Sequence, residues 1–147
     1  MTRDEFIAEY HKVSARAVYL SEKARREGLL ALEDEIDPDK EDRRDILELG
    51  IRFVVDGTDI EPLKEIMSNI IMQEEDKYAR IIKEMKATAV ISIQKGENIR
   101  ILASKLNSYT DIAYKDDPVF QKFKKEEDDD TWELSENEID ALIGGIN

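Results

Sequence analysis

The sequence contains no cysteine and one histidine, His11. The first absence excludes a disulfide framework and any thiolate metal site. A single histidine leaves a histidine-rich metal centre or a serine–histidine–aspartate triad short of the side chains that it needs. Phosphate-binding glycine loops are also missing, because Gly57 and Gly96 stand alone as helix terminators. We therefore expect neither a cofactor nor enzyme activity.

Long hydrophobic runs and an excess of basic charge are missing too. No apolar stretch approaches the ~20 residues of a membrane helix, and the N-terminal MTRDEFIAEY is too polar for a secretory signal. The net charge of −13 disfavours binding to nucleic acid or to anionic membranes. These features predict a soluble, cytoplasmic protein that does not insert into a membrane.

What is abundant is charge, at 39% of residues, whereas aromatics make up 7%. Such a composition, with few glycines and prolines, favours helices. Residues 2–5, TRDE, form a capping box. Apolar positions follow at steps of three and four, the spacing of one helix face, and predict a helix to about Glu35 that tolerates Gly28: Phe6, Tyr10, Val13, Ala17 and Leu20.

Further helices follow from the same signals. A second is predicted from near Asp39 to Val55, and a third from a capping box at residues 58–61 as far as Ile93. The third helix would be unusually long, and a kink near residues 73–76 is the alternative. A short fourth helix at 99–109 should turn Ile101, Leu102 and Leu106 inward. The prediction is an all-α antiparallel bundle of about four helices, one of them long, with a flexible acidic tail that ends in a short helix.

The domain division follows the charge. Residues 115–147 carry eleven acidic side chains against four lysines, about half of the net negative charge. We therefore predict a helical domain at 1–114, an acidic flexible linker at 115–133 and a peptide motif at 134–147.

Three blocks of the predicted helical domain carry a family resemblance. They are ARREGLLALE at 24–33, VVDGTD at 54–59, and ISIQKGEN at 91–98 followed by KLNSY at 105–109. In this order they resemble the cytoplasmic region of the flagellar motor stator protein MotA. That family carries two membrane helices before the first block and two more between the second and the third, where this chain has only about residues 72–79. The ion channel that the family forms with MotB cannot be built from this sequence, and Ile99 stands where the family usually has proline.

The resemblance implies an interaction surface. In that family, the helix that bears the first block offers charges to the rotor protein, and the matching residues are Arg25 and Glu33. Eight helical residues turn through about 800°, so both side chains are expected on one side of a continuous helix.

The C-terminal motif LSENEIDALI, at 134–143, has its own helix signals. Ser135 and Glu138 can form a capping box, and Ile139, Leu142 and Ile143 make one apolar stripe. Because so short a helix is unstable alone, the stripe predicts folding on a partner groove, with docking on its own bundle as the alternative. The motif also resembles the N-terminal peptide of the switch proteins FliM and FliN, which in FliM binds phosphorylated CheY. Two positions depart from that peptide, since Glu136 replaces a glutamine and Ile143 replaces a leucine. The matching residues are Leu134, Ser135, Glu138, Ile139, Asp140, Ala141 and Leu142.

Together these patterns predict a non-enzymatic accessory protein at the base of the flagellar motor. Its stator-like domain would engage rotor, switch or stator proteins, and its tail would recruit a phosphorylated CheY-like response regulator. The alternative is a structural helical adaptor or scaffold of the motor whose tail docks on its own bundle.

Overall fold

The computed structural model describes residues 1–37 and 45–125. Helices form throughout these ranges, and neither range contains a strand. The elements in chain order are α1 (Arg3–Glu27), η1 (Leu29–Glu35), α2 (Ile46–Val55), α3 (Ile60–Met72), α4 (Lys77–Lys95), α5 (Ile99–Asn107), η2 (Tyr114–Asp116) and α6 (Pro118–Lys125). The predicted all-α bundle is confirmed, while the short helix predicted in the tail lies outside the described residues.

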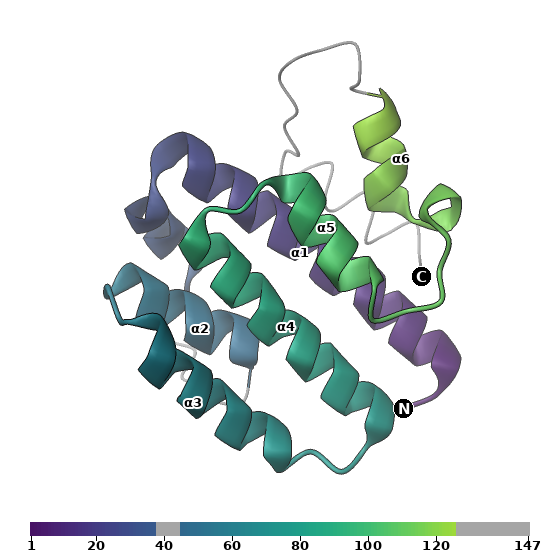
Figure 1. The fold of residues 1–147 in the computed structure, drawn as a ribbon, viewed down its shortest axis with the longest axis horizontal. Coiled ribbons are helices and arrows are strands. Elements are labelled where there is room, and N and C mark those ends of the chain that lie inside the picture. Colours follow the sequence, from purple (N-terminus) through teal and green to yellow (C-terminus); the bar gives the residue numbers. More distant parts are fainter. Residues whose placement is uncertain (38–44, 126–147) are drawn as a thin grey trace.

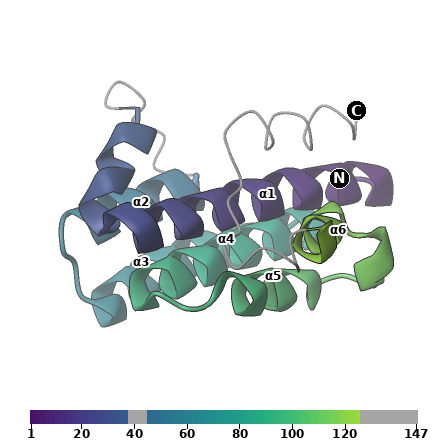
Figure 2. The same cartoon turned by 90° about the horizontal axis from the view of Figure 1, so that it is seen from above.

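Helix α4 lies at the centre of the bundle. In Figure 1, α3, α4 and α5 run side by side, and Figure 2 shows α1 and α2 on the other side of α4. Helix α4 packs against all four of these helices. The predicted apolar face of α1 is confirmed, because its five residues are buried at this junction: Phe6, Tyr10, Val13, Ala17 and Leu20.

Glycine residues determine the close contact of α2 with α4 and the ends of three helices. Gly50 brings α2 onto α4, since a Cβ atom there would lie 2.4 Å from Cγ2 of Val90. Gly28, with φ of +92°, ends α1. The prediction of one helix to Glu35 was therefore wrong, because residues 29–35 form the separate 3₁₀ helix η1. The predicted ends at Gly57 and Gly96 are confirmed by positive φ angles of 78° and 68°, which suit glycine.

The prediction of one long third helix was also wrong. The alternative, a kink near residues 73–76, has the right position, but the chain reverses there instead of bending (Figure 1). Residues 73–76 form a turn that reverses the chain between α3 and α4 (Figure 1). Asp76 caps α4 by accepting a hydrogen bond from the Ala79 amide at 2.8 Å. Helix α3 starts after Asp59, whose side chain makes no capping bond, so the predicted capping box at 58–61 was wrong. Helix α2 starts at Ile46 with Asp45 as its N-cap, rather than near Asp39, which lies outside the described residues.

The first part of the predicted linker is folded. Residues 114–116 form η2, residues 118–125 form α6, and Val119 and Phe123 are buried in the core against α1. The helical body thus continues past residue 114 to the end of α6. In α5, Leu102 and Leu106 are buried as predicted, but Ile101 is 50% exposed, and its predicted inward position was wrong.

Candidate interaction surface

The short helix η1 is held against α1 by one carboxylate. Glu35 accepts hydrogen bonds from the Tyr19 hydroxyl at 2.6 Å, the Lys23 ammonium at 3.0 Å and the Arg16 guanidinium at 2.9 Å. These three donors lie three and four residues apart on α1, so they share one helix face. This cluster was not predicted from the sequence: the spacing of the three donors indicates that they share one face of α1, but it does not indicate which carboxylate binds them. We call α1 residues 25–27 together with η1 the ledge.

Electrostatics favour the ionised form of Glu35. Burial by itself would raise the pKa of this carboxyl, but the hydrogen bonds from Tyr19, Lys23 and Arg16 outweigh burial and leave the pKa below its ordinary value. An ionised, three-fold hydrogen-bonded carboxylate fixes η1 more firmly than apolar contacts alone. Glu35 therefore attaches the C-terminal end of η1 to α1.

The two residues expected to contact a rotor protein both lie on the ledge. Arg25 belongs to the last turn of α1 and Glu33 to η1, and both are exposed. Within the described ranges, neither side chain has an ion-pair partner. They do not share one continuous helix, because Gly28 separates their elements, so that geometric expectation was wrong. Leu30, 72% exposed, adds an apolar side chain to this charged surface.

A buried polar cluster around Asp117 fixes α6, at the C-terminal end of the helical body. Asp117, fully buried, accepts hydrogen bonds from the Tyr10 hydroxyl and from Asn107 Nδ2, the latter at 3.1 Å. Its other carboxylate oxygen accepts from the Val119 amide at 3.2 Å in the first turn of α6. Burial, followed by the charge of Asp117, raises the pKa of Tyr10, and burial lowers the pKa of the half-buried His11. The cluster joins α1, α5 and α6.

The described residues line several grooves on the surface of the bundle, among them grooves A and B. Groove A, between α3, α4 and α5, has a volume of about 500 Å³; its floor includes Met67, Ile71 and Ile91, and Lys64 and Lys105 line it as well. Groove B, between α5, η2 and α6, has a volume of about 760 Å³. Its lining combines the aromatic residues Tyr114, Phe120 and Phe123 with Arg100, Lys115, Ser104 and Gln121. Both grooves have the mixed apolar and polar lining that binds peptides.

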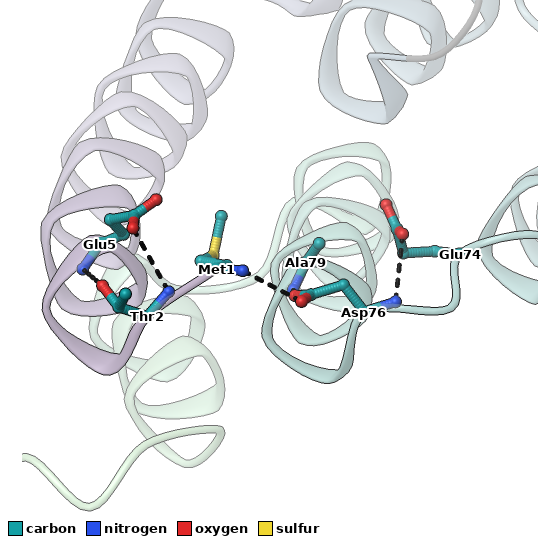
Figure 3. A network of polar contacts seen from close by, with 6 residues as sticks. All are labelled: Met1, Thr2, Glu5, Glu74, Asp76 and Ala79. Atoms are coloured by element: carbon teal, nitrogen blue, oxygen red, sulfur yellow. Dashed lines mark hydrogen bonds and ion pairs between the residues drawn. The ribbon is translucent and has the colours of Figure 1, made fainter.

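The N-terminus meets the α3–α4 turn. Figure 3 shows the Met1 ammonium group beside Asp76, with 3.0 Å between the nitrogen and Oδ1. The same view shows Asp76 capping α4 and, on α1, the predicted capping box of Thr2 and Glu5, which is confirmed. The N-terminus and the turn between α3 and α4 therefore lie at the same end of the bundle (Figure 3).

Among residues 1–37 and 45–125, no group of three or more acidic or histidine side chains could hold a metal ion. None of the helices in these ranges is long and apolar enough to cross a membrane. The predicted regulator-binding residues of the motif at 134–143 lie outside the described residues.

These features define an all-helical body whose exposed ledge and grooves suit contacts with proteins. The chain is 38% identical to Motility protein A of Treponema phagedenis and 37% identical to Motility protein A of Treponema pallidum (strain Nichols). Each match spans 87 residues, which is 58% of this chain and 32% of the relative. The chain thus spans about a third of the length of these curated relatives. The expected relation to MotA is confirmed at this level, whereas no protein-family model and no solved structure matches the chain.

Proposed function

We propose that this chain is a non-enzymatic protein of the bacterial flagellar motor whose helical body engages rotor or stator proteins. The similarity to Motility protein A of two Treponema species is the observation that carries the proposal. That name assigns motility to proteins about three times as long as the stretch matched here. The proposal therefore concerns binding by this body and does not include torque generation by the chain on its own.

The arrangement of the two ends supports this proposal. Met1 and the turn at 73–76 lie together at one end, and the ledge lies at the opposite end of α1 (Figure 1). A helix of 25 residues spans about 37 Å, so these two ends are well separated. A stator-like body anchored or docked near Met1 would present the ledge toward a second motor protein.

The ledge has the properties of a reversible electrostatic contact. Arg25 and Glu33 offer charges of both signs without ion-pair partners among the described residues, and Glu35 attaches the C-terminal end of η1 to α1. Exposed charge pairs contribute little affinity but guide association and select partners. We expect a weak contact that weakens further as salt is raised.

A binding experiment with defined charge changes tests the ledge. Binding of the purified torque-receiving rotor protein of the same bacterium would be measured for the wild type and for the Arg25→Glu and Glu33→Lys variants. Lys77→Glu, an exposed change in the first turn of α4, is the matched control. We expect each ledge variant to bind about 1.4- to 5-fold more weakly, which corresponds to about 0.2–1 kcal/mol per exposed pair, and the control to bind like the wild type.

Binding that is equal in all four proteins would remove the ledge from the proposal. A charge-swapped rotor protein that regains affinity for Arg25→Glu alone would identify the partner of that guanidinium. Wild-type protein that binds neither rotor nor stator proteins would contradict the proposed function itself.

The second part of the proposal concerns the motif at 134–143. Its resemblance to the FliM and FliN peptide supports recruitment of a phosphorylated CheY-like response regulator through Leu134, Ser135, Glu138, Ile139, Asp140, Ala141, Leu142 and Ile143. The acidic residues before and within the motif would steer a regulator with a basic rim toward it. A stator-like body combined with a regulator-binding tail would act in the cytoplasm at the base of the motor.

Groove A favours the alternative of an adaptor whose motif docks on its own bundle. Its apolar floor complements a helix with one apolar stripe, while its two lysines pair with Glu61 and Glu97 of the body. Small-angle scattering of the full chain against a chain that ends at Lys125 separates the two ideas. A full chain hardly larger than the shortened one supports the adaptor, whereas a clearly extended chain supports a tail that is presented to a regulator. The cut must follow α6, because Val119 and Phe123 belong to the core.

A further inference from the structure

Groove B has unpaired cations in its described lining, whereas the lysines of groove A pair with Glu61 and Glu97. The chain carries a net charge of −13, yet the described residues that line this groove include two cations and no acid. Both cations, Arg100 and Lys115, are exposed, and neither has an ion-pair partner within the described ranges. Two unneutralised cations beside an apolar floor favour an acidic ligand that also carries an apolar group.

The floor of groove B is aromatic. The Tyr114 and Phe120 rings stack with their centres 4.1 Å apart, and Phe120 meets Phe123 edge to face at 5.7 Å. The Arg100 guanidinium lies 5.3 Å from the centre of the Phe123 ring, so the cation is fixed above the floor. Tyr114 is 53% exposed, which leaves a ring free to pack against a further aromatic side chain. The groove therefore offers an aromatic surface with positive charge at its edge.

The sequence that follows α6 has the complementary chemistry. Residues 126–130 are five consecutive acids, EEDDD, and residue 132 is the single tryptophan of the chain. Helix α6 is about 12 Å long, whereas the seven residues 126–132 can span about 23–25 Å when extended. After a reversal at the end of α6, these residues are long enough to return along the helix as far as η2.

We propose that residues 126–132 bind groove B of the same molecule, with carboxylates at Arg100 and Lys115 and the Trp132 ring on the aromatic floor. An attachment point directly after α6 gives an effective concentration in the millimolar range, which favours the segment of the same chain over that of a second copy. The interaction does not depend on the proposed motor function. It leaves the motif at 134–143 outside the groove, where it remains available to another protein.

The fluorescence of Trp132 tests this proposal directly in the full chain. The emission maximum and acrylamide quenching would be compared for the wild type, for Arg100→Ala/Lys115→Ala, and for a chain with residues 126–130 changed to their amides. Lys77→Ala/Lys95→Ala removes the same charge at exposed positions outside the groove and is the control. We expect a buried, blue-shifted Trp132 in the wild type and in the control. In the other two variants, emission should shift to longer wavelength and quenching should increase.

Salt and protein concentration complete the test. Raising NaCl from ~0.15 M to ~1 M shortens the Debye length from about 8 Å to about 3 Å, and should release Trp132 in the wild type. Equal emission and quenching in the wild type and in the amide variant would overturn the proposal, and this variant leaves every residue of the helical body unchanged. A blue shift that grows with protein concentration would also overturn it, because the ligand would then come from a second copy.

Discussion

The Tyr10 hydroxyl of α1 donates a hydrogen bond to the Asp117 carboxylate, which lies 107 residues further along the chain. Asn107, in the last turn of α5, donates to the same carboxylate oxygen. Asp117 also accepts from the Val119 amide at the start of α6. One buried carboxylate thus determines where α6, the last described helix, packs. It thereby also positions the residues of α6 that line groove B.

The first prediction removes the central donor of this cluster. Tyr10→Phe keeps the ring in the core but leaves the buried Asp117 carboxylate with one hydrogen bond fewer. Loss of a partner from a buried acceptor costs about 1–3 kcal/mol, and we expect that decrease in the free energy of unfolding. Urea denaturation followed by circular dichroism measures it. Tyr114→Phe, at a half-exposed tyrosine, is the control and should change stability by less than about 0.5 kcal/mol; equal effects of the two changes would contradict this account.

The second prediction concerns the close approach of α2 and α4. Gly50→Ala would gain up to about 1 kcal/mol in helix propensity, but its Cβ would lie 2.4 Å and 2.7 Å from the two γ carbons of Val90. Val90 is fully buried, so the methyl group has little room and overpacking should cost about 1–3 kcal/mol.

A double-mutant cycle checks this contact. Because Val90→Ala removes both γ carbons, the double variant should be more stable than the sum of the two single changes implies. Additive effects, measured by chemical denaturation of the four proteins, would show that contact with Val90 is not the reason that position 50 requires glycine.

The third prediction uses the lowered pKa of Glu35. Its pKa is depressed in the folded protein, so the resulting stability is present above the unfolded value of about 4.5 and is lost as the pH falls through the folded pKa. Glu35→Gln should therefore be less stable than the wild type at neutral pH, and the difference should shrink below about pH 4.5. Thermal unfolding across this pH range tests the sign. Glu33→Gln, an exposed residue of the same helix, is the control, and a Glu35→Gln deficit that stays constant with pH would contradict the prediction.

Local signals in the sequence predict much of this fold. The capping box at Thr2, the helix ends at Gly57 and Gly96, and the buried face of α1 depend on neighbours within a few residues, and all were predicted correctly. The break between α3 and α4 also has a local signal, the N-cap Asp76, but the apolar periodicity on both sides of the turn favoured one long helix. Periodicity alone does not distinguish a continuous helix from two helices that pack against each other.

Features that depend on distant residues could not be predicted in this way. Residues 115–125 resemble a linker by charge, whereas the contact of Asp117 with Tyr10 and Asn107 and the burial of Val119 and Phe123 show why α6 is part of the body. Gly28 is compatible with a continuous helix by composition. The hydrogen bonds between Glu35 and α1 form because the chain turns at Gly28, so they could not be predicted from the sequence pattern. The positions of Arg25 and Glu33 on the ledge therefore required the structure.

The last prediction concerns the proposed regulator contact of the tail. A purified CheY-like response regulator carrying a phosphoryl mimic would be titrated calorimetrically into the full chain. We expect weak, salt-sensitive binding, because a few apolar anchors must offset the cost of ordering the motif. Ile139→Ala removes one anchor of the stripe and should weaken binding by about 2 kcal/mol, or roughly 30-fold.

Asn137→Ala is the matched control for this measurement, because residue 137 lies outside the apolar stripe and is not among the residues that match the switch-protein motif. It should bind like the wild type, and the regulator without its phosphoryl mimic should bind more weakly than the mimic. Equal affinities of wild type and Ile139→Ala would show that the stripe does not contact the regulator. Absence of binding at high micromolar concentrations of the regulator would contradict recruitment by the tail. It would not affect the proposed contact of the ledge with a rotor protein, which is tested by a separate experiment.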